Sequence, residues 1–152
     1  MFNVLFVCTE NTCRSPLAEY LTKHLLKELN IKNVIVKSCG ISVTSVSKIA
    51  DNSKKILKEL GIKFRFKPKQ ITNKMVEEAD LILTMTMQHK IAVSLKYDCF
   101  NKLYTFAEYT NGKDILDPYG GDLNVYRQTA SDIYNNCLLL IKKLSKKGVI
   151  NV

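Results

Sequence analysis

Short apolar runs alternate along this chain with segments in which apolar residues recur every three or four positions. The runs are rich in β-branched and aromatic residues, and they predict four strands, at residues 3–7, 34–36, 81–83 and 102–105. The segments with the longer period predict helices, at residues 15–29, 52–60, 72–79, 88–95 and 123–147. Strand, crossover helix and strand in succession favour a parallel sheet. We therefore predict one doubly wound α/β domain over residues 1–152, with a four-stranded parallel sheet flanked by helices.

Local signals refine several of these elements. Thr72 is expected to cap the third helix, and Gly61 to end the second. The last helix is expected to reach the core through Val125, Ile133, Leu140, Ile141 and Leu144. Residues 64–69 (FRFKPK) are predicted to form an exposed basic linker, and residues 110–121, rich in Gly, Asp and Pro, a surface loop.

The stretch between the first strand and the first helix carries the candidate chemistry. It reads Cys8-Thr9-Glu10-Asn11-Thr12-Cys13-Arg14-Ser15-Pro16. Ser15 is a candidate N-cap, and Pro16 suits the first helical position. A tight loop from a strand end to a helix start points backbone N–H groups and the positive end of the helix dipole at one place. The stretch therefore predicts an anion site.

Cys8 and Arg14 are the residues that could carry out a reaction at this anion site. A helix N-terminus and a nearby cation favour a nucleophilic thiolate. A guanidinium can hold two oxygens of a phosphate-like group at once. Nucleophile, anion cradle and clamp within eight residues are the plan of a cysteine-dependent phosphatase.

Simpler interpretations exist for the same residues. Cys8 could be an inert buried side chain and Arg14 a solvated one. Cys8 and Cys13 could also be half of a metal site, which needs two more ligands. The chain offers only two histidines and three scattered cysteines, none of them paired at metal-ligand spacing. We therefore expect neither a metal nor a cofactor.

Composition bounds the partners and the compartment. The net charge of +9 suits acidic partners, but no basic stripe is interleaved with stacking aromatic residues, so we do not expect nucleic acid. No apolar run approaches the ~20 residues that span a bilayer, and no secretory signal is recognisable. Five cysteines without a framework spacing favour a reducing, cytoplasmic setting. We expect a monomer.

Three stretches carry a resemblance to a known family. Residues 8–15 resemble the phosphate-binding loop of the low-molecular-weight protein tyrosine phosphatases. Asp117-Pro118-Tyr119, shortly before the last helix, resembles the stretch that carries the general acid of that family. Residues 79–86 (ADLILTMT) are also similar, so the resemblance runs over nearly the whole chain.

The resemblance implies a role for each matched residue. Cys8 would attack phosphorus to form a phosphocysteine, and Arg14 with the loop amides of residues 9–15 would hold the phosphoryl oxygens. Asp117 would be the general acid, with Asp114 as the competing carboxylate.

The resemblance also implies supporting roles. Ser15 would donate a hydrogen bond to the sulfur, beside its alternative role as a helix cap. Asn11 and Ser38 would brace the loop, although residues 66–70 lack the histidine that many relatives place there. Cys13 would form a reversible disulfide with Cys8, or simply pack at the base of the loop.

Thr12 bears on the substrate. Family members specialised for phosphotyrosine usually carry a larger aliphatic residue there, whereas the bacterial protein-arginine phosphatase branch carries threonine. Residues 117–121 (DPYGG) and 88–90 (QHK) also resemble that branch. Tyr119 stands where the branch often has phenylalanine and would form a wall of the pocket. We therefore predict protein phosphoarginine as the substrate, with protein phosphotyrosine as the alternative.

Glu10 departs from the family pattern, because relatives usually have glycine there. Glutamate brings a negative charge near the phosphate, and backbone strain if the position needs a positive φ.

Three other functions receive less support from the sequence. A thioredoxin-coupled arsenate reductase needs a relay pair of cysteines, but Cys99 and Cys137 are isolated. A phosphotransferase-system B subunit does not require Arg14 or Asp117. A non-catalytic phosphoprotein-binding module would lack Cys8 or Asp117, and this chain has both.

Overall fold

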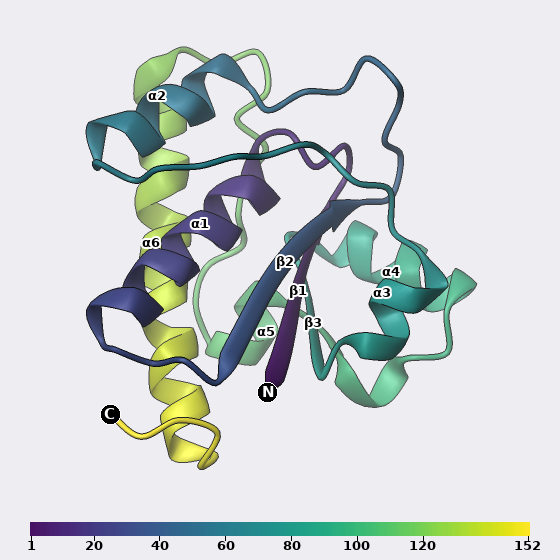
Figure 1. Ribbon diagram of the computed structural model, residues 1–152. Helices are drawn as coiled ribbons and strands as arrows, with labels where there is room; N and C mark the ends of the chain where they lie inside the picture. The colour runs from purple at the N-terminus through teal and green to yellow at the C-terminus, as the bar shows by residue number, and fades with distance from the viewer.

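The computed structural model describes residues 1–152 and has a central sheet between two layers of helices (Figure 1). The strands are β1 (Phe2–Cys8), β2 (Val34–Gly40), β3 (Leu81–Thr84) and β4 (Leu103–Thr105). They are all parallel and lie in the order β2-β1-β3-β4, which confirms the predicted fold class. The order reverses beside β1, and the crevice at the carboxyl ends of strands at such a switch point is where open α/β sheets bind ligands.

The helices divide between the two faces of the sheet (Figure 1). One face carries α1 (Arg14–Glu28), α2 (Asp51–Glu59), α5 (Phe106–Thr110) and α6 (Leu123–Lys146). The other carries α3 (Asn73–Glu78) and α4 (Met87–Lys96), and a short 3₁₀ helix (Phe100–Lys102) precedes β4. The larger apolar cluster, of 28 buried residues, lies under α1 and α6, and a cluster of ten lies under α3 and α4. The phosphate-loop end of α1 therefore rests on the larger core.

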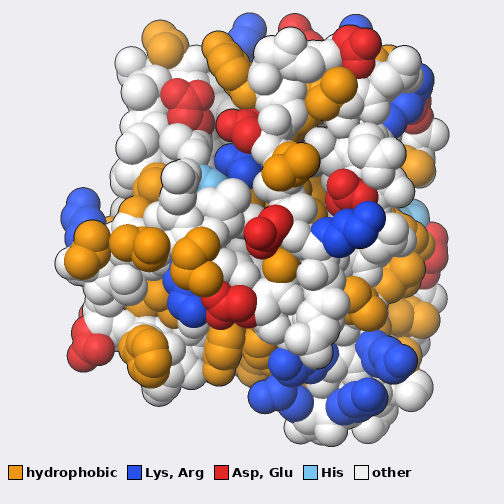
Figure 2. Space-filling view, turned by 180° about the vertical axis from the view of Figure 1, so that it is seen from behind, with side chains coloured by type: hydrophobic (Ala, Val, Ile, Leu, Met, Phe, Trp, Pro, Cys, Tyr) orange, Lys and Arg blue, Asp and Glu red, His pale blue; other side chains and the backbone are white.

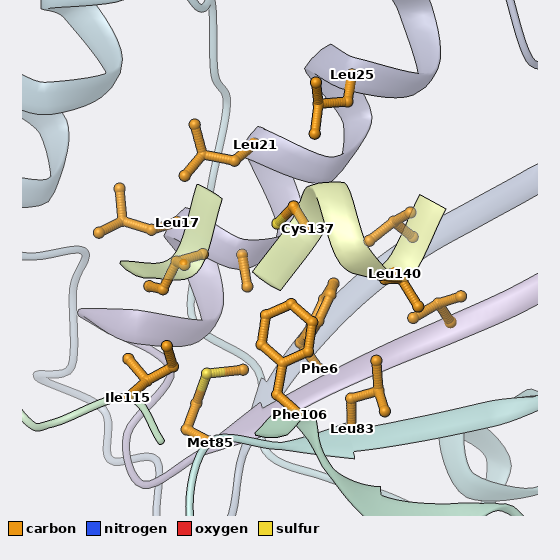
Figure 3. Packing of buried hydrophobic residues seen from close by; sticks show 14 of the residues in the cluster. Phe6, Leu17, Leu21, Leu25, Leu83, Met85, Phe106, Ile115, Cys137 and Leu140 are labelled. Atoms are coloured by element: carbon orange, nitrogen blue, oxygen red, sulfur yellow. The ribbon is translucent and has the colours of Figure 1, made fainter. Parts of the chain in front are cut away.

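Aromatic and aliphatic side chains from distant segments fill this larger core (Figure 3). The rings of Phe6 on β1 and Phe106 on α5 meet edge to face, with centroids 5.1 Å apart. Leu17 and Leu21 of α1 and Leu140 of α6 complete the packing and are almost fully buried. Burial of each such side chain stabilises the fold by roughly 1.5–3 kcal/mol.

Side-chain caps fix the starts of four helices. Thr72, Thr86, Thr105 and Asp122 each accept a hydrogen bond from the backbone N–H three residues later. The predicted cap at Thr72 is therefore confirmed. Gly61 follows α2 with a φ of 68°, a left-handed conformation that suits glycine, and its predicted role as the end of that helix is also confirmed.

The start of α1 differs from the prediction. The helix begins at Arg14, so Cys13 occupies the N-cap position, where no side chain caps the helix. Ser15 lies inside the first turn and turns its hydroxyl toward the loop instead of capping. The Ser15 hydroxyl therefore bonds to the loop, at the Cys8 sulfur, and does not cap the helix.

Three apolar expectations were also wrong. Val125 is 45% exposed, because the buried stripe of α6 passes through the neighbouring Tyr126 instead. The first helix was predicted to include residue 29 on its apolar face, but α1 ends at Glu28, and Leu29 is 43% exposed. The segment at residues 64–69 is not exposed throughout, since Phe64 and Phe66 are half-buried and pack edge-on against one ring of α1.

The surface carries the positive charge of the composition. Figure 2 shows basic side chains gathered over the lower end of the molecule, where α6 ends. The last turn of α6 contains Lys143 and Lys146. None of the helices is both long enough and apolar enough to cross a membrane.

The α6 packing generates a stability prediction. Leu140→Ala should lower the free energy of unfolding by about 2–5 kcal/mol, because it leaves a cavity in the core. Leu139→Ala, one position away on the exposed side of the helix, should lower it by about 1 kcal/mol or less. Urea denaturation of both variants measures the difference, and equal losses would contradict this description of the core.

Candidate active site

The stretch between β1 and α1 folds as a tight loop that the segment after β2 holds in place. The backbone N–H of Ile41 donates to the carbonyl of Cys8 (3.1 Å), and that of Ser42 donates to the carbonyl of Thr9 (2.8 Å). Further along, the N–H of Ala50 donates to the carbonyl of Thr12 (2.8 Å). With these carbonyls bonded behind the loop, its N–H groups are available to the pocket.

Gly40 at the end of β2 makes this close packing possible. A Cβ atom at this position would lie 2.6 Å from the carbonyl oxygen of Thr9 and 2.8 Å from the backbone nitrogen of Asn11. Both neighbours are backbone atoms, so neither can rotate away. No local signal in the sequence marks this glycine, because its requirement comes from a chain segment 30 residues away.

Asn11 is the central brace of the loop. Its backbone is left-handed (φ 60°), a conformation that asparagine tolerates better than most residues. Its buried amide nitrogen donates to the hydroxyls of Ser15 (2.7 Å) and Ser38 (2.9 Å). Its amide oxygen accepts the backbone N–H of Lys69 (3.0 Å). That backbone group supports the loop at a place where the sequence offers no histidine.

The Asn11 amide also determines how Ser15 faces Cys8. The Ser15 hydroxyl oxygen is 2.9 Å from the Cys8 sulfur. Because that oxygen already accepts from the amide, its own proton is free to donate to the sulfur. A hydrogen bond donated to sulfur favours the thiolate.

Glu19 extends the network away from the loop and was missed from the sequence. This carboxylate is 7% exposed and accepts a hydrogen bond from the Ser38 hydroxyl (2.6 Å). It also forms a salt bridge with Lys23, one helical turn later. A Glu–Lys pair at this spacing resembles an ordinary surface pair in the sequence. Only the arrival of β2 beside α1 shows that the glutamate is internal.

Arg14 lies under the pocket with its guanidinium held on two sides. The side chain is buried, and one terminal nitrogen donates to the carbonyl of Ile115 (3.1 Å). The other lies 3.7 Å from a carboxylate oxygen of Asp117, whose side chain is 56% exposed. Solvent screens this second contact, so it contributes little to stability. The Ile115 side chain is fully buried, which anchors the segment that carries Asp117.

The loop after β1 and the segment that carries Asp117 surround a pocket of about 250 Å³. Its lining consists of Cys8, Thr9, Glu10, Thr12, Cys13, Arg14, Asp117 and Tyr119. The structure thus brings together the predicted nucleophile, clamp and acid from two segments about 100 positions apart. Asp114, the competing carboxylate, is exposed and does not line the pocket.

The rim is formed by exposed side chains. Tyr119 is 83% exposed, and its backbone N–H donates to the Asp117 carboxylate (3.1 Å), which orients that carboxylate. Glu10 is also exposed at the rim. Its φ is not positive, since Asn11 is the left-handed residue of this loop. The expected backbone strain at Glu10 is therefore absent, and its negative charge remains.

Cys13 packs at the base of the loop as a free thiol. Its sulfur lies 3.4 Å from the hydroxyl of Tyr126 on α6. Burial raises the pKa of this thiol, and the hydrogen bond to Tyr126 opposes that effect. Cys13 is therefore protonated at neutral pH.

His89 on α4 is a further residue beside the loop. Its Nε2 is 2.8 Å from the hydroxyl oxygen of Thr9, and its ring is buried. Burial, assisted by the positive charge of Arg14, lowers the pKa of His89 to about 4, so the ring is neutral. In the sequence, only the resemblance of residues 88–90 points to this histidine, because no local pattern connects α4 with a loop 80 positions earlier.

Comparisons with known proteins agree with this architecture. The model of the low molecular weight phosphotyrosine protein phosphatase family matches residues 3–150. A protein-arginine-phosphatase of Bacillus subtilis is 35% identical over 147 residues, covering 95% of this chain and 97% of its own. The low molecular weight protein-tyrosine-phosphatase PtpB of Staphylococcus haemolyticus is also 35% identical, over 142 residues, covering 93% and 96%.

A solved structure extends the match to three dimensions. A cysteine-to-serine mutant of the YwlE arginine phosphatase, with its active-site serine phosphorylated, superposes with a TM-score of 0.90 at 34% identity. The match covers 95% of this chain and 97% of that one. The family model covers nearly the whole chain and the likeness in structure is equally complete, so this protein belongs to the low molecular weight phosphotyrosine protein phosphatase family.

Proposed function

We propose that this protein is a cysteine-dependent phosphatase that removes the phosphoryl group from phosphoarginine in proteins. The observation that carries the proposal is the convergence of Cys8, Arg14 and Asp117 on one pocket at the carboxyl end of β1. The family supplies the reaction class.

The reaction proceeds in two displacements. In the first, the Cys8 thiolate attacks phosphorus, an S–P bond forms, and the P–N bond to the guanidinium breaks. Asp117 gives a proton to the departing nitrogen. In the second, water attacks phosphorus, Asp117 takes its proton, and the S–P bond breaks to release phosphate and the thiolate. The phosphorylated active-site serine of the related YwlE mutant is the oxygen counterpart of such an intermediate.

Arg14, the loop N–H groups and the Ser15 hydroxyl stabilise the charge that moves during these steps. Arg14 and the loop N–H groups hold the phosphoryl oxygens, and they are already in place before a ligand arrives. The hydroxyl of Ser15 stabilises the sulfur when it leaves as thiolate.

Thr12 supports phosphoarginine as the substrate. Its side chain lines the pocket and is half-buried, so it meets whatever group carries the phosphoryl. A small hydroxyl leaves room for the broad guanidinium, which a larger aliphatic side chain would crowd. Asp117 can also accept a hydrogen bond from the guanidinium nitrogens.

Protein phosphotyrosine is the second candidate substrate. The exposed ring of Tyr119 at the rim can pack against a phenyl ring as well as against a guanidinium. One relative named for tyrosine phosphatase activity matches at the same 35% identity as one named for arginine phosphatase activity. Thr12 is the residue that favours phosphoarginine.

The setting follows from the same chemistry. Residues 1–152 are proposed to act as a single domain that is monomeric and independent of metals. A cytoplasmic setting is proposed because the nucleophile must stay reduced. A phosphorylated protein, rather than nucleic acid or a membrane, is the proposed partner, and the net charge of +9 suits its acidity.

Cys13 is proposed as a redox partner of Cys8. Peroxide would oxidise Cys8 to a sulfenic acid, and the Cys13 thiol would then attack that sulfur with release of water. The resulting disulfide would protect the nucleophile from further oxidation, and a dithiol reductant would restore it.

The first experiment compares initial rates on a phosphoarginine peptide and a matched phosphotyrosine peptide in reducing buffer. Cys8→Ser serves as the blank and should show no turnover. A preference for phosphoarginine supports the proposal. A preference for phosphotyrosine retains the phosphatase and removes the substrate assignment, and turnover by Cys8→Ser would refute the nucleophile.

The acid role of Asp117 is tested on a substrate with a poor leaving group. Asp117→Asn should slow hydrolysis by about 10²-fold or more, because the departing atom loses its proton donor. Asp114→Asn, three positions earlier and outside the pocket, is the control and should keep the rate. Similar rates for both variants would move the acid role to another residue.

Thr12→Ile should shift the ratio of kcat/KM values toward the phosphotyrosine peptide. The ethyl group that replaces the hydroxyl crowds the broad guanidinium more than it crowds the single bridging oxygen of an aryl phosphate. Peptide kinetics with both substrates provide the ratio, and an unchanged ratio would reduce Thr12 to a packing residue.

Glu10→Gln should tighten inhibition by inorganic phosphate severalfold. This corresponds to about 1 kcal/mol, the energy of one screened charge contact. The substitution removes the rim charge and keeps the shape. The inhibition constant at low ionic strength measures the effect, which should shrink as salt is added. An unchanged constant would show that the carboxylate points away from the ligand.

A further inference from the structure

His89 forms a hydrogen-bonded chain that ends at the pocket. Its Nδ1 lies 3.1 Å from the hydroxyl oxygen of Thr86, the residue that caps α4. Its Nε2 lies 2.8 Å from the hydroxyl oxygen of Thr9, which lines the pocket directly after Cys8. Both ring nitrogens are therefore bonded, one to the helix cap and one to the phosphate loop.

The ring is neutral, so only one of its nitrogens carries a proton. Arg14 and Asp117 are the charged groups that act on it, and the arginine has the larger effect, which reinforces the effect of burial. The direction of the chain thus depends on which nitrogen is protonated.

The Thr86 hydroxyl favours one direction. Its oxygen already accepts the backbone N–H of His89 (3.3 Å), as an N-cap must. Its proton is then available for Nδ1, which places the ring proton on Nε2. Nε2 donates to the Thr9 oxygen, and the Thr9 proton is free to point into the pocket. In the opposite tautomer, the Thr9 proton would bond to the ring, and Thr9 would offer only lone pairs to an anion.

We propose that His89 is a positioning residue that holds the Thr9 hydroxyl as a hydrogen-bond donor toward the bound phosphoryl group. The inference rests on the proposed function only in that the pocket binds a phosphoryl anion. Thr9 thereby adds a side-chain donor to the loop N–H groups and Arg14. An anion in the pocket stabilises this tautomer, because only a donor hydroxyl interacts favourably with it.

A double-mutant cycle tests whether His89 acts through Thr9. The cycle compares the wild type, Thr9→Val, His89→Leu and the double variant, and the measurement is the dissociation constant for inorganic phosphate. Thr9→Val should weaken binding about tenfold, the loss of one hydrogen bond to a charged group. His89→Leu should weaken binding in the wild-type background and have no further effect in Thr9→Val. An equal effect in both backgrounds would overturn the proposal.

A conservative variant separates positioning from packing. His89→Gln can place an amide N–H near the former Nε2 and should recover most of the phosphate affinity that His89→Leu loses. If the leucine variant fails to fold, the glutamine variant and Thr9→Val carry the test. His24→Gln changes the other histidine of the chain, on the far part of α1, and should leave phosphate binding unchanged. Loss of affinity in His89→Gln as large as in the leucine variant would refute the positioning role.

Nuclear magnetic resonance of the ¹⁵N-labelled histidine rings observes the tautomer directly. With only two histidines, the His24→Gln spectrum assigns His89. At pH 7 with inorganic phosphate bound, His89 should be neutral and protonated on Nε2. A proton on Nδ1 in the phosphate complex would exclude the proposed direction of the chain.

The design separates this inference from the proposed substrate. Weaker phosphate binding in Thr9→Val and His89→Leu, without turnover of either phosphopeptide, would remove the proposed function and keep the positioning role. Normal turnover of a phosphopeptide with additive effects in the double-mutant cycle would keep the proposed function and remove the positioning role of His89.

Discussion

The buried amide of Asn11 connects the parts of the chain that meet at the phosphate loop. It bonds to Ser15 on α1, to Ser38 on β2 and to the backbone of Lys69, while its own backbone makes the left-handed turn. A side chain without both a donor and an acceptor could not satisfy these three groups, and a buried polar group left unpaired costs about 1–3 kcal/mol. The direction of the Ser15 proton toward Cys8 depends on this one amide.

The electrostatics of the site follow from how deeply each charge lies. Arg14 is buried and donates to the Ile115 carbonyl, whereas the side chain of Asp117 is exposed to solvent. Burial, assisted by the positive charge of Arg14, lowers the pKa of His89 and keeps that ring neutral. The site thus combines a buried positive charge beneath the pocket with a neutral hydrogen-bonding ring at its side and an exposed carboxylate at the rim.

The sequence predicted the four strands, five of the six α-helices and the loop because their signals are local, whereas the short α5 was missed. Strand runs, helical repeats and the spacing of Cys8 and Arg14 are legible within about a dozen residues. The misses came from side-chain contacts and backbone geometry that no local pattern encodes. Ser15 resembles a helix cap until Asn11 claims its oxygen, and Glu19 resembles a surface residue until β2 covers it. Glu10 appeared strained because the left-handed position was expected one residue too early.

The roles of Gly40 and His89 also depend on contacts that cannot be predicted from the sequence. A Cβ atom at Gly40 would meet the backbone of Thr9 only because of the register between β1 and β2. No spacing in the sequence encodes that register. The pairing of His89 with Thr9 likewise requires β3 and α4 to be placed beside β1. Family resemblance indicated which residues matter, and the structure supplied the contacts through which they act.

The loop joins the central strand to the first helix, so ligand occupancy and folding are thermodynamically linked. An anion that binds only the folded chain shifts the unfolding equilibrium by mass action, by about 1.4 kcal/mol when its concentration is ten times its dissociation constant. The melting temperature of this protein should therefore depend on the buffer anion. A screen of small oxyanions by thermal shift would rank ligands of the pocket without any substrate, and a variant with a damaged loop would lose its response to them before losing its fold.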